Sequence, residues 1–160
     1  MMKTIAHLTA TFFGLGHAPV ASGTVGSAGA LALVLALGWA LPADRHGLYL
    51  PVVLVLAALL FAVGVPAGSW AERRYGRKDP SQCVVDEVVG YLIAVAWISP
   101  PGWAAALVAF LVFRGADIVK PYPARRLEAL PGGLGILLDD VVAGLYSLVV
   151  MIGVRLFLTG

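Results

Sequence analysis

Long apolar segments alternate with shorter polar ones along the whole chain, and this alternation predicts membrane-spanning helices. Apolar residues dominate five segments, which are 23–41, 48–68, 82–98, 103–119 and 139–158. A hydrocarbon core of about 30 Å needs about 20 apolar residues in a helix, so we expect about five spans, of which 82–98 is short. Residues 1–22 are moderately apolar but interrupted by glycines, which predicts an interfacial helix and loop.

The connections between these segments are of two kinds. Two are short turns, 42–47 and 99–102, and two are long and charged, 69–81 and 120–138. Alternation along the chain places both charged connections and the N-terminus on one side of the membrane. That side carries Lys3, Arg73, Arg74, Arg77, Lys78, Lys120, Arg125 and Arg126, and the opposite side carries Arg45 and Arg155. The positive-inside rule then predicts that the charged side of this multi-pass protein is cytoplasmic.

The composition agrees with one membrane-embedded domain over residues 1–160. Of the 160 residues, 60% are hydrophobic and 12% are charged, which is far from the average for soluble proteins. The expected fold class is all-α, a polytopic membrane helical bundle of about five spans with an N-terminal interfacial segment. The net charge of +2 is too small to indicate nucleic acid as a partner. Nothing in the sequence indicates an oligomeric state.

Five carboxylates fall at the ends of predicted spans that share the charged side. Asp86 and Glu87 begin the third span, Asp117 ends the fourth, and Asp139 and Asp140 begin the fifth. Oxygen ligands without clustered histidine or cysteine favour Mg²⁺. Aspartate at a helix start also caps free N–H groups, so helix capping is the alternative for either pair alone.

Basic side chains accompany these carboxylates. Arg114 and Asp117 are three residues apart and share a helix face, and Lys120 follows at the end of the helix. A guanidinium and an ammonium beside a divalent ion would suit a phosphate ester. The alternative is an ion pair between Arg114 and Asp117, with Lys120 extending to lipid headgroups.

Glycines, a histidine and the single cysteine complete the candidates. The runs 22–27 and 132–135 precede or open apolar helices, and such helix N-termini attract phosphate, although glycine also permits close helix packing. His17 is a candidate proton donor to a leaving group, or else a surface residue. Cys83 is expected to be a small packing residue and not a nucleophile.

Three blocks of the sequence resemble the phosphatidylglycerophosphatase A family. They are FGLGHAPVASGTVGS at 13–27, DPSQCVVDEVVG at 79–90 and FRGADIVKPYPARRLEALPGGLGILLDDVVAG at 113–144. The blocks occur in the family's order and spacing. The resemblance implies a Mg²⁺-dependent lipid phosphatase of the bacterial inner membrane. Its substrate would be the membrane lipid phosphatidylglycerophosphate, which the enzyme would convert to phosphatidylglycerol and inorganic phosphate.

The same resemblance implies the site residues. The catalytic and metal-binding residues would be Asp86, Glu87, Asp117, Asp139 and Asp140, and the phosphate-binding residues would be Arg114, Lys120, Thr24 and Gly23. Two positions depart from the family pattern. Ser22 stands where a proline is expected before Gly-Thr, and Ala129 follows Glu128 where the family often has a basic residue.

Other readings of the acidic pattern stay open at this point. A small membrane transporter or channel subunit also carries carboxylates inside the membrane, but its polar groups should lie near the midplane and not at one end. A structural membrane subunit is a third class. Within the phosphatase reading, the attacking group is either an oriented water or an aspartate that forms a phospho-aspartyl intermediate.

Overall fold

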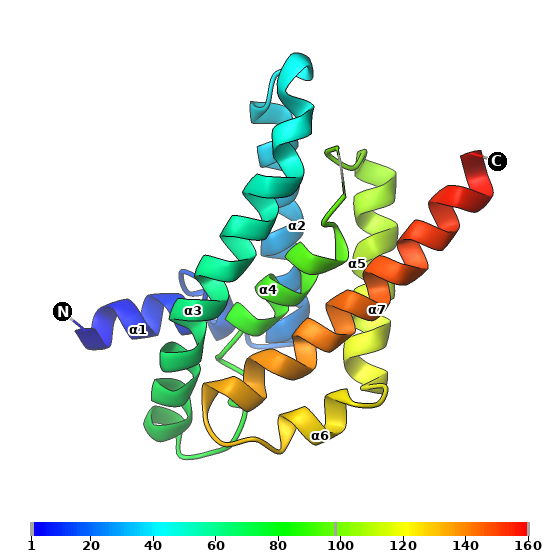
Figure 1. Ribbon diagram of the computed structural model, residues 1–160. Coiled ribbons are helices and arrows are strands. Elements are labelled where there is room, and N and C mark those ends of the chain that lie inside the picture. The colour runs from blue at the N-terminus through cyan, green and yellow to red at the C-terminus, as the bar shows by residue number, and fades with distance from the viewer. Residues whose placement is uncertain (1, 98, 160) are drawn as a thin grey trace.

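The computed structural model describes residues 2–97 and 99–159, and the regular structure of these residues is helical throughout (Figure 1). Seven α-helices and two 3₁₀ helices follow one another in this part of the chain. They are α1 (Met2–Ala10), η1 (Leu15–His17), α2 (Ser22–Ala40), η2 (Ala43–Leu48), α3 (Tyr49–Tyr75), α4 (Val85–Ala94), α5 (Trp103–Val119), α6 (Ala124–Glu128) and α7 (Gly133–Thr159). The predicted all-α class is confirmed.

Within residues 2–97 and 99–159, three helical segments are long and apolar enough to cross a membrane, so the predicted count of five spans is not confirmed. They are Ser22–Ala40, Ala43–Tyr75 and Gly133–Arg155. Helix α5 has the predicted bounds, with 17 residues. Helix α4 has only 10 residues, which gives about 15 Å of helix, half of the hydrocarbon thickness. The predicted end of that segment, Ile98, lies outside the described residues.

Helix α4 lies inside the bundle and packs against α2, α3, α5 and α7 (Figure 1). Val88, Tyr91 and Leu92 on this helix have no exposed surface. The Tyr91 hydroxyl donates a hydrogen bond of 2.8 Å to the carbonyl oxygen of Ala106 on α5. The segment is therefore apolar because protein surrounds it, and apolar composition alone does not distinguish this environment from lipid.

Two glycines bring α4 and α7 into backbone contact. A Cβ atom on Gly90 would lie 2.7 Å from the carbonyl oxygen of Asp140, and a Cβ atom on Gly144 would lie under 3.0 Å from the carbonyl oxygen of Gly90. Gly90 is four residues after Asp86, and Gly144 is four residues after Asp140, so each glycine shares a helix face with an aspartate. The close approach of the two helices, which small residues permit, therefore places the two aspartates side by side.

Helix α7 begins at Gly133, well before the start predicted at Asp139. The Gly133 amide donates a hydrogen bond of 2.8 Å to Ser69 Oγ on α3, and a Cβ atom on Gly133 would overlap the carbonyl oxygen of Val65. The glycine run is thus a packing contact between α7 and α3. Asp139 lies nearly two turns inside the helix, where an aspartate does not cap the free N–H groups. Helix capping is excluded for Asp139 and Asp140.

The polar connections gather at one end of the bundle. Helix α3 continues through the predicted polar segment to Tyr75 and ends at Gly76, whose φ of 68° is left-handed. Residues 76–84, α6 and the start of α7 lie at the same end (Figure 1). Helix η2 and the C-terminal end of α7 lie at the opposite end. The two ends correspond to the side rich in basic residues and the side with few of them that the sequence predicts.

The N-terminal segment forms the short helix α1, which packs across α3 at the side of the bundle (Figure 1). Its last residue, Ala10, accepts a hydrogen bond of 2.8 Å from the amide of Val84. The segment also exposes Ile5, Leu8 and Phe13. A short helix that is held to the bundle and exposes large apolar side chains has the form expected of an interfacial segment.

Candidate active site

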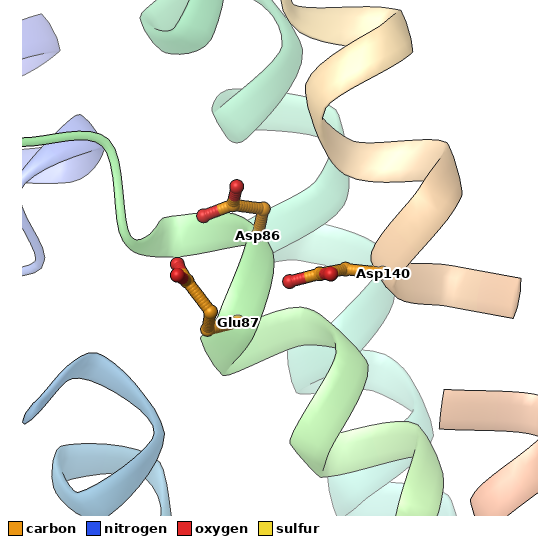
Figure 2. A group of neighbouring side chains, drawn as sticks. All are labelled: Asp86, Glu87 and Asp140. Carbon is orange, nitrogen blue, oxygen red and sulfur yellow. The ribbon is translucent and has the colours of Figure 1, made fainter. Parts of the chain in front are cut away.

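Three carboxylates from two helices converge at the polar end of the bundle. Asp86 and Glu87 occupy the first turn of α4, and Asp140 projects from α7 toward them (Figure 2). One oxygen from each lies within 4.8 Å of the others. Asp86 and Asp140 are 6% and 3% exposed, and the Glu87 side chain is 14% exposed. We call these three residues the carboxylate cluster.

The hydrogen bonding of the carboxylate cluster is incomplete. Asp86 Oδ1, Glu87 Oε2 and Asp140 Oδ2 are buried and accept no hydrogen bond from any described residue. A buried carboxylate without a partner is costly, and three of them repel one another. A hard divalent cation, which is held by a few carboxylate oxygens, would satisfy these atoms. The residues present therefore fit Mg²⁺.

Arg114 and Asp117 form the edge of the carboxylate cluster. Arg114 Nη1 lies 2.6 Å from Asp117 Oδ2 on the same helix, and 3.9 Å from Glu87 Oε1 on α4. Arg114 Nε is buried and donates to no described residue. The intrahelical ion pair between Arg114 and Asp117 is present, and it leaves a guanidinium donor available for another anion.

The two aspartates of the α7 pair have different surroundings. Asp140 belongs to the carboxylate cluster, whereas Asp139 Oδ2 lies 2.7 Å from Lys120 Nζ, which also lies 3.0 Å from Glu128 Oε1. Burial alone would lower the pKa of Lys120, but hydrogen bonds to Asp139 and Glu128 outweigh it and raise this pKa above its ordinary value. Lys120 therefore stays charged and joins α5, α6 and α7 at the polar end.

An open pocket of about 380 Å³ borders the carboxylate cluster. Glu87 and Arg114 form part of its lining, together with residues from the loop before α2 and from the loop before α4. Gly23 lines it as well, and a Cβ atom on Gly23 would overlap Glu87 Oε1. Thr24 is exposed and Lys120 is partly exposed, and neither is in the lining.

Other residues at the pocket were not assigned from the sequence. Ser22, where the resemblance led to the expectation of a proline, donates a hydrogen bond to the carbonyl oxygen of Ser81, so it fastens α2 to the loop before α4. Asp79, in that loop, lines the pocket and has a φ of 44°. A left-handed φ at a residue other than glycine is uncommon, but the sequence does not reveal it. In the sequence, Asp79 belongs to a charged segment and begins the block 79–90 that carries the family resemblance, but it was not singled out as a site residue.

Cys83 and His17 do not have the surroundings of catalytic groups. Cys83 is 2% exposed, and burial, followed by the charge of Glu87, raises the pKa of its thiol. The thiol therefore stays protonated at neutral pH, which agrees with a packing role. His17 Nε2 lies 3.3 Å from His7 Nε2, and the pocket lining on this loop begins at Ala18.

The family model for phosphatidylglycerophosphatase A matches residues 8–155. This chain belongs to the phosphatidylglycerophosphatase A family. It is therefore an enzyme, a phosphoric monoester hydrolase of a family that acts on phospholipids. Family membership decides against the transporter, channel and structural alternatives.

Individual members of the phosphatidylglycerophosphatase A family cover most of the chain. A protein of Haemophilus influenzae named phosphatidylglycerophosphatase A is 36% identical over 93% of this chain and 88% of its own length. The Escherichia coli protein of that name is 33% identical over 88% of this chain and 78% of its own length. A Bacteroides thetaiotaomicron protein named "Putative phosphatidylinositol-3-phosphatase" is 36% identical, over 90% and 89% respectively. No solved structure matches. The bacterial relatives and the apolar helices fit a membrane protein.

Proposed function

We propose that this member of the phosphatidylglycerophosphatase A family hydrolyses the phosphate monoester of phosphatidylglycerophosphate, releasing phosphatidylglycerol and inorganic phosphate. The proposal includes Mg²⁺ as cofactor and the cytoplasmic face of the bacterial inner membrane as the location. The observation that carries the proposal is the carboxylate cluster. Its buried, unpartnered oxygens would bind a cation, and the open pocket beside them would admit the phosphate anion.

The carboxylate cluster would hold the ion through Asp86, Glu87 and Asp140. Bound there, Mg²⁺ supplies a Lewis acid for the phosphate ester. Asp139 would not bind the metal, but its pairing with Lys120 would fix α7 to the end of α5 and thereby orient the adjacent Asp140. This assignment divides the adjacent aspartates into a ligand and a positioning residue.

Arg114 would bind the substrate phosphate. Arg114 lines the pocket, and its Nε has no hydrogen-bond partner among the described residues; a guanidinium pairs well with phosphate oxygens. Asp117 holds the other edge of the guanidinium in place. Neutralising charge on the transferred group is the main electrostatic task in phosphoryl transfer.

The position of the pocket is suited to a lipid headgroup. The pocket opens at the polar end of the bundle, while apolar side chains such as Leu59 on α3, Leu111 on α5 and Val149 on α7 are exposed along its flanks. A lipid substrate would therefore keep its acyl chains beside the helices and extend its terminal phosphate into the pocket. The eight basic residues predicted for the charged side support a cytoplasmic orientation.

Phosphate release from the purified protein in detergent micelles tests the proposal. Phosphatidylglycerophosphate, phosphatidylinositol 3-phosphate and phosphatidic acid should be compared, with Mg²⁺ and with EDTA. We expect Mg²⁺-dependent release that is fastest with phosphatidylglycerophosphate. Faster turnover of phosphatidylinositol 3-phosphate would show that the proposed substrate is wrong. Full activity in EDTA would show that the reaction does not need Mg²⁺.

A further inference from the structure

A second pocket lies between α1 and α3, and none of the described residues lines both it and the active-site pocket. Its volume is about 640 Å³, within the range of about 300–1,000 Å³ typical of ligand sites. The walls are apolar and include Ile5 and Ala6 from α1 and Ala62, Val63 and Pro66 from α3. We call this pocket the α1–α3 groove.

Two cations belong to the lining of the α1–α3 groove. Lys3 comes from the first turn of α1, and Arg73 comes from the last turn of α3. Both are exposed, and neither forms an ion pair within the described residues. Trp70, also in the lining, is only half-buried and packs edge-on against His7 at 5.8 Å between ring centroids.

An apolar groove with two unpaired cations has the chemistry of a site for an amphiphile with a negative head. We propose that the α1–α3 groove binds an anionic phospholipid, with an acyl chain along the apolar walls and the phosphate against Lys3 and Arg73. Basic pockets beside membrane helices recognise anionic headgroups in this way, and a tryptophan between apolar and polar surroundings is typical of the membrane interface.

The bound lipid would also stabilise the N-terminal helix. Helix α1 has nine residues, fewer than an isolated helix needs to persist in water, and its apolar side chains Ile5 and Leu8 are exposed. A lipid tail between α1 and α3 would cover part of this surface. The proposed site is distinct from the catalytic pocket, so the inference does not depend on which lipid phosphate the enzyme hydrolyses.

Quenching of Trp70 fluorescence by brominated lipids tests the inference. The chain has four tryptophans, so the variant Trp39→Phe, Trp97→Phe, Trp103→Phe retains Trp70 alone. This protein should be placed in phosphatidylcholine nanodiscs that contain brominated phosphatidylglycerol or, at the same low mole fraction, brominated phosphatidylcholine. Circular dichroism of the variant checks that the helices are intact.

We expect a clear preference for the anionic lipid near Trp70. One basic residue near a membrane surface favours an anionic lipid by about fivefold, so Lys3 and Arg73 together predict roughly a 25-fold preference at low salt. The added changes Lys3→Gln and Arg73→Gln should abolish this preference. The matched control Arg74→Gln and Lys78→Gln removes the same charge from exposed residues outside the groove, and it should leave the preference intact.

Equal quenching by the two brominated lipids would overturn the inference. An equal loss of the preference for the anionic lipid in the matched control would also overturn it, because the preference would then come from general membrane electrostatics. If the single-tryptophan protein does not fold, native mass spectrometry of the chain with all its tryptophans gives a second measurement. Phosphatidylglycerol should then stay bound to the wild type and to the matched control, and should be lost when Lys3 and Arg73 are neutralised. Equal retention in all three proteins would contradict the site.

Discussion

Replacing Gly90 with alanine would separate the two helices that carry the carboxylate cluster. The new Cβ atom would lie 2.7 Å from the carbonyl oxygen of Asp140 and 2.6 Å from Phe113 Cε2. Because ordinary contacts begin at 3.4 Å, α4 and α7 must move apart by about 0.7 Å. Asp140 belongs to this contact and Asp86 lies one helical turn before Gly90, so both carboxylates would move with their helices.

The expected effect of Gly90→Ala is large for activity and small for stability. A displacement of about 1 Å in a catalytic arrangement can lower the rate about 100-fold, so we expect kcat to fall by about 10- to 100-fold. Overpacking costs about 1–3 kcal/mol, and alanine in place of glycine in a helix returns about 1 kcal/mol. The net change in the free energy of unfolding is therefore about 0–2 kcal/mol.

The assay for Gly90→Ala is phosphate release in micelles, measured with thermal unfolding of the same preparation. Gly153→Ala is the matched control, because Gly153 is also helical but a Cβ atom there meets nothing within 4 Å. The control should keep wild-type kcat and gain up to about 1 kcal/mol in stability. Wild-type kcat in Gly90→Ala would refute the inference that this glycine contact sets the geometry of the cluster.

Three further substitutions test separate parts of the site. Arg114→Lys replaces a forked donor by a point charge, so kcat/KM for the lipid phosphate should fall by about 10- to 100-fold while Mg²⁺ binding is unchanged. Loss of Mg²⁺ binding in calorimetry would contradict the role of Arg114 as a phosphate-binding residue. Gly23→Ala should displace the Glu87 carboxylate and raise the Mg²⁺ concentration for half-maximal activity, and an unchanged titration would show that Glu87 is not a ligand. Cys83→Ser should keep most of the activity. N-ethylmaleimide should not inactivate the wild type at neutral pH, because the thiol of Cys83 is buried and protonated. Rapid inactivation would indicate a reactive thiolate.

The helical class predicted from the sequence is confirmed, but the sequence alone does not assign a role to each candidate site residue. Asp86, Glu87 and Asp140 were all candidates, but adjacent residues on a helix point about 100° apart, so local pattern alone does not choose between Asp139 and Asp140. The choice follows from the contact of Gly144 with α4, which joins residues that are distant in the chain.

The number of spans was the prediction least supported by the structure. The segment that contains α4 is as apolar as a lipid-exposed helix, and hydropathy does not distinguish burial in protein from burial in lipid. The start of α7 was predicted too late because the glycines at 132–135 indicate a loop, whereas Gly133 packs directly against α3. In both places tertiary contacts decide the structure.

Calorimetric titration of Mg²⁺ into the detergent-solubilised protein tests the carboxylate cluster most directly. Saturable binding is expected for the wild type and for Asp139→Asn, because Asp139 pairs with Lys120 outside the cluster. Asp86→Asn and Asp140→Asn should each abolish that binding while the helical circular dichroism is retained. Equal Mg²⁺ affinity in all four proteins would contradict the assignment of these carboxylates as the metal site.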